Sequence, residues 1–209
     1  TVIGPDELAA IVDVCAKRKL RLISDEIYHG IEYGGRAQTA LGYSRDVLVI
    51  NSFSKYFSMT GWRIGWMVVP DDLVRTIERL TQSFYISPPT LSQIAALAAL
   101  DAADELDGHV RTYAANRSRL LKALADAGFG TIAPADGAFY LYANVEPFGM
   151  DSTTMTKRLL EEAGVAATPG HDFDPFEGER WVRFSYAGSQ REVEAAADAL
   201  VAWCSDARR

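Results

Sequence analysis

The chain has 209 residues, of which 48% are hydrophobic and 23% charged, and these fractions exclude a disordered or fibrous protein. Its 28 acidic residues outnumber the 21 basic ones, and a net charge of −7 disfavours a general nucleic-acid-binding protein, which normally presents a basic face. The length allows one large domain or two small ones with a substantial core.

Cysteine usage and hydropathy indicate the compartment. Cys15 and Cys204 form neither a disulfide framework nor a zinc-ligand pattern, which favours a reducing compartment such as the cytoplasm. The longest nearly apolar run, residues 91–100, is too short to span a bilayer. Asp6 and Glu7 stand where a secretory signal would have a basic start and an apolar block. We therefore expect no membrane partner.

The first third of the chain alternates between helix and strand. Pro5, Asp6 and Glu7 open a helix, because proline suits the first helical turn and acids suit its positive end. Short apolar runs predict strands over residues 20–24, 47–50 and 64–69. This alternation indicates an α/β fold with a largely parallel sheet, in which ligands bind beyond the carboxyl ends of the strands.

Helical periodicity dominates after Pro70. It predicts helices over residues 73–84, 90–103, 108–127 and 153–163, and a last helix that starts at the capping box of Ser189 and Glu192. Strands are predicted over residues 138–143, 165–168 and 181–186. The boundary near residues 100–112 separates an α/β part, residues 1–107, from a smaller α+β part, residues 108–209.

Lys55 is the residue around which a site can be built. The dinucleotide, P-loop, nucleophile-elbow and HExxH motifs are all absent, and the three histidines show no metal-ligand spacing, so His109 and His171 are expected to be satisfied or solvent-facing. Lys55 follows a buried strand, where desolvation favours a free amine that acts as nucleophile or base. A lone lysine there is more often a solvated surface residue, so the residues around Lys55 in the sequence must distinguish a functional lysine from a surface one.

Those neighbours carry a long motif. Residues 52–66 have the sequence SFSKYFSMTGWRIGW, and Asp25-Glu26-Ile27-Tyr28 precedes them. Together they resemble the class I/II aminotransferases, which are fold type I pyridoxal-phosphate enzymes with the pattern SFSKxFxMTGWRxGW. Shorter matches at residues 137–140, 168–170 and 182–185 extend the resemblance over nearly the whole chain.

The resemblance implies pyridoxal 5′-phosphate as cofactor and assigns roles to the residues that match. Lys55 would form the Schiff base with the cofactor and move the substrate Cα proton. Asp25, as a buried acid, would pair with the pyridinium nitrogen and keep it protonated. Tyr28 would donate to the phenolic oxygen of the ring, although by itself it is an ordinary half-buried aromatic.

The resemblance also implies two anion sites. Arg63 and Ser52 would hold the cofactor phosphate, and Ser54 is a candidate for a further contact. Arg183 would bind the substrate α-carboxylate as a bidentate pair. The aromatic side chains nearby are expected to be core or pocket wall without a chemical role: Trp62, Trp66, Phe139 and Tyr140.

The implied fold is the carboxyl-terminal part of the fold type I large domain, a mainly parallel sheet with helices, over residues 1–107, followed by the small α+β domain over residues 108–209. The implied reaction moves an amino group between an amino acid and a 2-oxo acid, in a homodimer. A β-lyase or decarboxylase of the same fold, or the aminotransferase-like domain of a transcription regulator, are the alternatives, because fold does not fix function.

Members of this family run to roughly 400 residues, two to three ordinary domain lengths. We therefore expect the chain to be a carboxyl-terminal half that starts just after the family's NPxNPTG segment. Such a half should expose sheet edges and a large apolar face. It should also be a poor catalyst by itself, since half of the cofactor contacts would lie in the preceding segment.

Overall fold

A computed structural model describes residues 1–207 of the chain. The chain forms two compact units. One comprises Val2–Val110, and the other comprises Thr1 and the residues from Arg111 onward. The long helix α4 (Ala103–Ala127) begins in the first unit and ends in the second.

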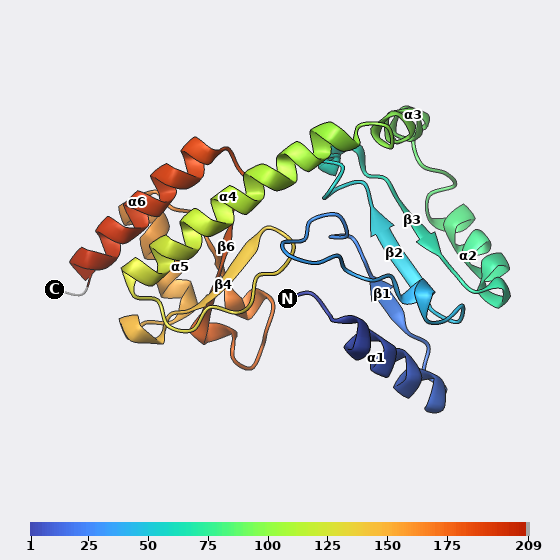
Figure 1. Cartoon of the computed structure of the whole chain (residues 1–209), viewed down its shortest axis with the longest axis horizontal. Coiled ribbons are helices and arrows are strands. Elements are labelled where there is room, and N and C mark those ends of the chain that lie inside the picture. The colour runs from blue at the N-terminus through green and yellow to red at the C-terminus, as the bar shows by residue number, and fades with distance from the viewer. Residues whose placement is uncertain (208–209) are drawn as a thin grey trace. The chain divides into compact units, whose positions relative to one another are not determined.

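The unit Val2–Val110 is built on a three-stranded sheet, drawn with β2 in its centre in Figure 1. Its strands are β1 (Ile23–Asp25), β2 (Leu48–Ser52) and β3 (Gly65–Val68). β1 and β2 are parallel, whereas β2 and β3 are antiparallel. The expected α/β class is confirmed, and one of the two strand pairs in this sheet is parallel while the other is antiparallel.

The direction of β3 follows from its connection. Residues 26–47 give β1 and β2 a crossover long enough for a parallel pair, and they include the 3-10 turn η1 (Ala40–Gly42). Residues 53–64 contain only a loop and the short 3-10 turn η2 (Thr60–Trp62). Without a crossover helix the chain turns back, so β3 runs antiparallel to β2.

Three helices accompany this sheet. The predicted acidic start of α1 (Pro5–Lys17) is confirmed, and its Leu8 packs against Ala40, Val47 and Val49. α2 (Asp71–Phe84) follows β3, and α3 (Thr90–Ala99) packs its Ala96 against the side chains of Phe53 and Met59. The loop around Lys55 therefore rests on α3.

Large apolar side chains remain exposed on this unit. Leu97 of α3 is 70% exposed and Trp66 of β3 is 40% exposed. Others of the same kind are Met67, Val68, Leu80, Phe84, Leu91 and Ile94. These exposed apolar side chains belong to β3, α2 and α3.

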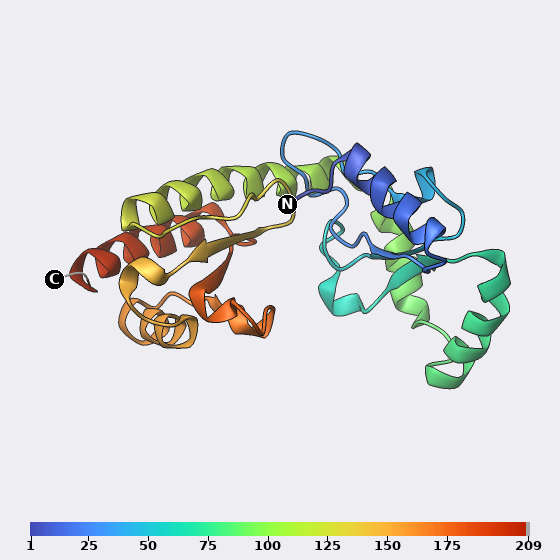
Figure 2. The same ribbon diagram turned by 90° about the horizontal axis from the view of Figure 1, so that it is seen from below.

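The second unit carries an antiparallel sheet. Its strands β4 (Tyr140–Asn144), β6 (Trp181–Ser185) and β5 (Thr168–Pro169) lie in that order. The helices are α5 (Ser152–Ala163), α6 (Gln190–Ala207) and the end of α4. α4 and α6 lie side by side in both views (Figures 1 and 2), and the Arg119–Asp198 ion pair joins them.

Local sequence signals predicted the start of α6 correctly but the start of α4 incorrectly. The capping box is confirmed, since Glu192 N donates to Ser189 Oγ (3.2 Å) and Ser189 N donates to Glu192 Oε2 (3.1 Å). α4 starts at Ala103 and not near residue 108, because Gly108 costs only about 1 kcal/mol inside a helix and does not end it. Among residues 1–207, no helix combines the length and apolar character needed to cross a bilayer.

Candidate functional site

Four of the predicted site residues lie at one edge of the first sheet. Asp25 ends β1 and Ser52 ends β2, and the parallel pairing of these strands brings their carboxyl ends to the same edge. The antiparallel β3 begins at this edge, because Gly65 pairs with Ser52. Lys55 and Arg63, in the loop between β2 and β3, are therefore anchored there too.

Lys55 lies against the turn that follows β1. Its Nζ is 5.6 Å from the centroid of the Tyr28 ring, a cation–π distance. Both side chains are half-buried. The structure thus brings together a lysine and a tyrosine that are 27 positions apart in the sequence.

Ser52 forms hydrogen bonds at the start of the loop that carries Lys55, residues 52–63, here called the lysine loop. Its Oγ accepts a hydrogen bond from Ser54 N (3.0 Å) and donates to the carbonyl of Ile64 (3.4 Å). The carbonyl of Ser54 accepts from Thr60 Oγ1 (2.8 Å), which closes the loop on itself. These bonds hold the backbone on both sides of Lys55.

Arg63 is exposed at the end of the same loop. Its backbone is left-handed, with φ 51°, and its Nη1 donates to the carbonyl of Thr60 (2.9 Å). A guanidinium has five N–H donors, so Arg63 can meet an anion while it stays bonded to its own loop.

Asp25 differs from the expectation of a buried acid. It is exposed, and its Oδ1 accepts a hydrogen bond from Ile27 N (3.3 Å). Side chains two positions apart share a face of a strand, and Ile23 on that face is 59% exposed. The buried acid of this turn is the next residue, Glu26, which is 4% exposed.

Sequence reasoning missed the support behind Lys55. The hydroxyl of Tyr56 donates to Asp107 Oδ1 (2.7 Å) near the start of α4, and burial together with this carboxylate raises the pKa of Tyr56 to about 12. A Cβ on Gly30 would lie 2.6 Å from the Tyr56 ring, so only glycine fits beneath it. Ser58 Oγ lies 3.1 Å from His109 Nδ1.

The Tyr56–Asp107 and Ser58–His109 contacts each join residues 51 positions apart, and no local signal could have paired them. The expectation of a satisfied His109 is confirmed by its bond to Ser58. Trp62 and Trp66 are 41% and 40% exposed, so they are not core residues of this chain. Trp66 instead packs edge-on against Phe53, with ring centroids 5.0 Å apart.

Arg183 belongs to the other unit, on β6. Its Cζ lies 4.2 Å from the centroid of the Tyr140 ring and 4.1 Å from that of Phe173. Two aromatic rings thus hold the planar guanidinium by cation–π contacts. Tyr140 was expected to be core or pocket wall, and Phe173 was not singled out because it lies in a loop without a motif.

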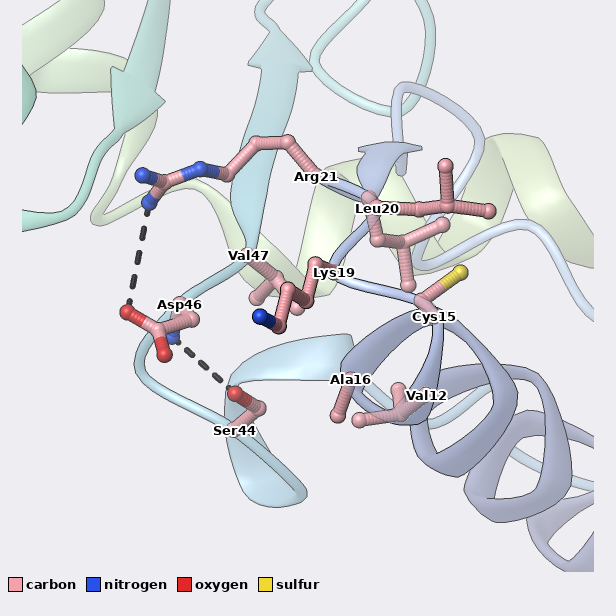
Figure 3. Close-up of a pocket in the computed structure, with 10 residues that line it drawn as sticks. Val12, Cys15, Ala16, Lys19, Leu20, Arg21, Ser44, Asp46 and Val47 are labelled. Atoms are coloured by element: carbon pink, nitrogen blue, oxygen red, sulfur yellow. Dashed lines mark hydrogen bonds and ion pairs between the residues drawn. The ribbon is translucent and has the colours of Figure 1, made fainter.

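A pocket lies at the opposite edge of the first sheet. Its volume is about 370 Å³, and it is lined by the end of α1 and by the residues that precede β1 and β2, which Figure 3 shows around Lys19, Arg21 and Asp46. Arg21 is paired with Asp72 (2.9 Å) and lies 3.9 Å from Asp46. The pocket contains none of the predicted site residues. Among the side chains that the structure describes, no cluster of three or more His, Cys, Asp or Glu residues could hold a metal ion.

Comparisons with known proteins agree with the motif. A family model described as aminotransferase class I and II matches residues 1–200. A valine–pyruvate aminotransferase of Mycobacterium tuberculosis is 49% identical over 207 residues, which are 97% of this chain and 53% of that protein. A (5-formylfuran-3-yl)methyl phosphate transaminase of Methanocaldococcus jannaschii is 36% identical over 178 residues, 83% of this chain and 47% of that protein.

Solved structures match the fold closely. An aminotransferase from Mycobacterium tuberculosis has a TM-score of 0.94 at 48% identity, over 99% of this chain and 54% of that chain. The aromatic aminotransferase from Pyrococcus horikoshii has a TM-score of 0.91 at 27% identity, over 100% and 57%. The chain spans about half the length of the curated relatives it matches. With a family match over residues 1–200, the chain belongs to the class I and II aminotransferase family.

Proposed function

We propose that the whole protein is a pyridoxal-phosphate-dependent aminotransferase that moves an amino group between an amino acid and a 2-oxo acid. The observation that carries this proposal is the lysine loop, residues 52–63. It sets Lys55 against Tyr28 at the sheet edge where Asp25, Ser52 and Arg63 also lie.

The chemical groups at this edge of the sheet match the functional groups of the cofactor. Pyridoxal phosphate carries an aldehyde, a basic ring nitrogen, a phenolic oxygen and a phosphate. The edge offers an amine for the aldehyde, a carboxylate for the nitrogen and a tyrosine hydroxyl for the phenolic oxygen. A serine hydroxyl and a guanidinium suit the phosphate, because charge-assisted hydrogen bonds are the strong ones.

In this proposal the bound cofactor supplies a ring that accepts electrons released at the substrate Cα. Lys55 would hold the cofactor aldehyde until the substrate amine displaces it, and the freed lysine amine would then carry the proton from the substrate Cα to the cofactor carbon that had borne the aldehyde. Asp25 keeps a proton on the ring nitrogen, and Tyr28 donates a hydrogen bond to the phenolic oxygen. Ser52 and Arg63 hold the phosphate, with Ser54 as a further candidate contact.

Arg183 binds the α-carboxylate of the substrate in this proposal. The rings of Tyr140 and Phe173 contact the guanidinium by cation–π interactions, and its planar fork suits bidentate pairing with a carboxylate. Valine with pyruvate is the first substrate pair to assay, because the relative at 49% identity carries that name.

We also propose that residues 1–107 are the carboxyl-terminal part of the cofactor-binding large domain and that residues 108–209 are the small domain. A homodimer is expected by resemblance to the family, and light scattering of the purified protein tests it. The cytoplasm is the expected compartment, because Cys15 and Cys204 do not make up a disulfide framework.

Borohydride reduction of the full gene product, incubated with pyridoxal phosphate, tests the site. Peptide mass spectrometry should find a pyridoxyl group on Lys55, and Lys55→Ala should abolish it. A label found on Lys17, Lys19, Lys122 or Lys157, or on no lysine, would sink the assignment. If the absorbance of the cofactor returns after amino-acid addition without any 2-oxo acid, the protein is a lyase or decarboxylase and not a transaminase.

A further inference from the structure

Glu26 is a buried carboxylate that the proposed mechanism leaves without a task. It is 4% exposed and follows Asp25 directly. Taking a carboxylate out of water costs several kcal/mol unless it is paired and hydrogen-bonded. The buried Glu26 carboxylate must therefore be compensated by the groups that bond to it.

Three groups surround the Glu26 carboxylate. Ser24 Oγ donates to Oε1 (3.0 Å), and the backbone N of Ala40 donates to the same oxygen (2.9 Å). His29 Nδ1 lies 3.4 Å from Oε2. One side chain thus bonds to β1, to the turn after β1 and to the start of η1.

The backbone of Glu26 adds two further bonds. Its N–H donates to the carbonyl of Ile50 in β2 (2.8 Å), and its carbonyl accepts from His29 N (3.0 Å). The turn that carries Asp25 and Tyr28 is therefore fixed at both ends by one residue. These bonds restrain the backbone between Asp25 and His29, which carries both of those side chains.

The same turn contacts both Lys55 and its neighbour in the chain, Tyr56. The Tyr28 ring lies 5.6 Å from the lysine Nζ, and Gly30, next to His29, lies directly against the ring of Tyr56. Tyr56 is the neighbour of Lys55 in the chain. A displacement of the turn would therefore change the setting of the lysine as well as that of Tyr28.

We propose that Glu26 is a positioning residue: bonded to Ser24, His29 and Ala40, its carboxylate sets Asp25 and Tyr28 against the cofactor ring. The proposal rests on the proposed function, because it takes that ring as the partner of Asp25 and Tyr28. Glu26 itself touches neither the cofactor nor the reacting atoms. Its influence passes through the turn.

The test uses the full gene product with four variants. Glu26→Gln keeps the size of the side chain but removes the charge that faces His29, and Ser24→Ala removes one bond to the carboxylate. Tyr28→Phe removes the hydroxyl that meets the cofactor in the proposal. The matched control is Glu78→Gln, whose carboxylate pairs with Arg75 on the exposed surface of α2.

Two readouts separate positioning from mere folding. The first is the pH at which the absorbance of the bound cofactor changes, which reports the hydrogen bond to its phenolic oxygen. Glu26→Gln should shift this pH in the same direction as Tyr28→Phe, and Glu78→Gln should not. The second is kcat, which should fall about tenfold or more with a smaller change in KM, because a misplaced catalytic group costs rate more than binding.

A double variant gives the decisive result. If Glu26 acts through Tyr28, adding Glu26→Gln to Tyr28→Phe should shift the absorbance midpoint little further, because coupled sites are not additive. Equal shifts in both backgrounds, or none in either, would overturn the proposal. If Glu26→Gln does not fold, a smaller shift of the same kind in Ser24→Ala supports the proposal, and an unshifted midpoint there refutes it. Failure of the wild type to bind pyridoxal phosphate would instead refute the proposed function.

Discussion

Gly170→Ala should destabilise the protein through a clash that the structure locates atom by atom. Gly170 is buried just after β5, and a Cβ there would lie 2.5 Å from each of three oxygens: the carbonyls of Gly178 and Trp181 and the hydroxyl of Tyr142. Ordinary contacts are about 1 Å longer. Two of the three oxygens belong to the backbone and cannot rotate away.

The expected cost is at the upper end of the range for overpacked cores, about 3 kcal/mol of unfolding free energy. For a folding unit of the size of this 209-residue chain, that corresponds to a fall of roughly 6–12 °C in Tm. Calorimetry or thermal fluorescence of the purified protein measures it. Because Thr168 of β5 pairs with Arg183, the KM for the amino acid should rise too.

Gly188→Ala is the matched control in the same unit. Its new Cβ would meet Glu192 Oε2 at 3.6 Å and Val193 Cγ2 at 3.8 Å, which are ordinary contacts. Its free energy of unfolding should change by no more than about 0.5 kcal/mol, as is usual for surface substitutions, so its Tm should stay close to that of the wild type. Equal Tm values for the two variants would refute the steric argument.

Three further predictions concern single side chains. Phe173→Leu removes one of the two rings that contact the Arg183 guanidinium, a contact worth about 0.5–2 kcal/mol. KM for the amino acid should therefore rise roughly 2- to 30-fold with kcat nearly unchanged, while Phe176→Leu, at a side chain 93% exposed, should change neither. Tyr56→Phe removes the bond to Asp107 and should cost about 1–2 kcal/mol. Since the folded pKa of Tyr56, about 12, lies above the ordinary value of 10.0, this advantage of the wild type should be complete below pH 10.0 and disappear as the pH rises to about 12, in denaturation curves of both proteins. Asp151→Ala removes the cap of α5, whose Oδ1 accepts from Thr154 N (2.9 Å), and should cost about 1 kcal/mol at neutral pH. The bonds from Thr154 lower the pKa of Asp151 below 3.8, so the difference between wild type and variant should shrink as the pH falls below 3.8, and a constant difference would contradict this account.

Features encoded by neighbouring residues were predictable from the sequence. The Lys55 motif is contiguous, so its resemblance to a family needed no structure. The capping box of Ser189 and Glu192 lies within four residues, and the acidic start of α1 lies within three. Each depends on backbone geometry that local residues set by themselves.

Features that depend on distant partners were not predictable. The exposure of Asp25 is decided by what covers its face of β1, and the direction of β3 by the absence of a crossover helix between residues 53 and 64. The Tyr56–Asp107 bond and the Phe173–Arg183 contact each join segments that no spacing rule relates. Side-chain packing between such segments has no signature in a single sequence.

The left-handed backbone in the lysine loop has a consequence for how this protein could be improved or could evolve. Ser58 and Arg63 have φ values of 54° and 51°, a region in which any residue other than glycine or asparagine costs about 1 kcal/mol. Glycine at either position would relieve that strain. At Arg63 it would also remove the guanidinium that the proposed function needs. Selection for heat resistance and selection for turnover should therefore favour different residues at Arg63, a short distance along the chain from Lys55.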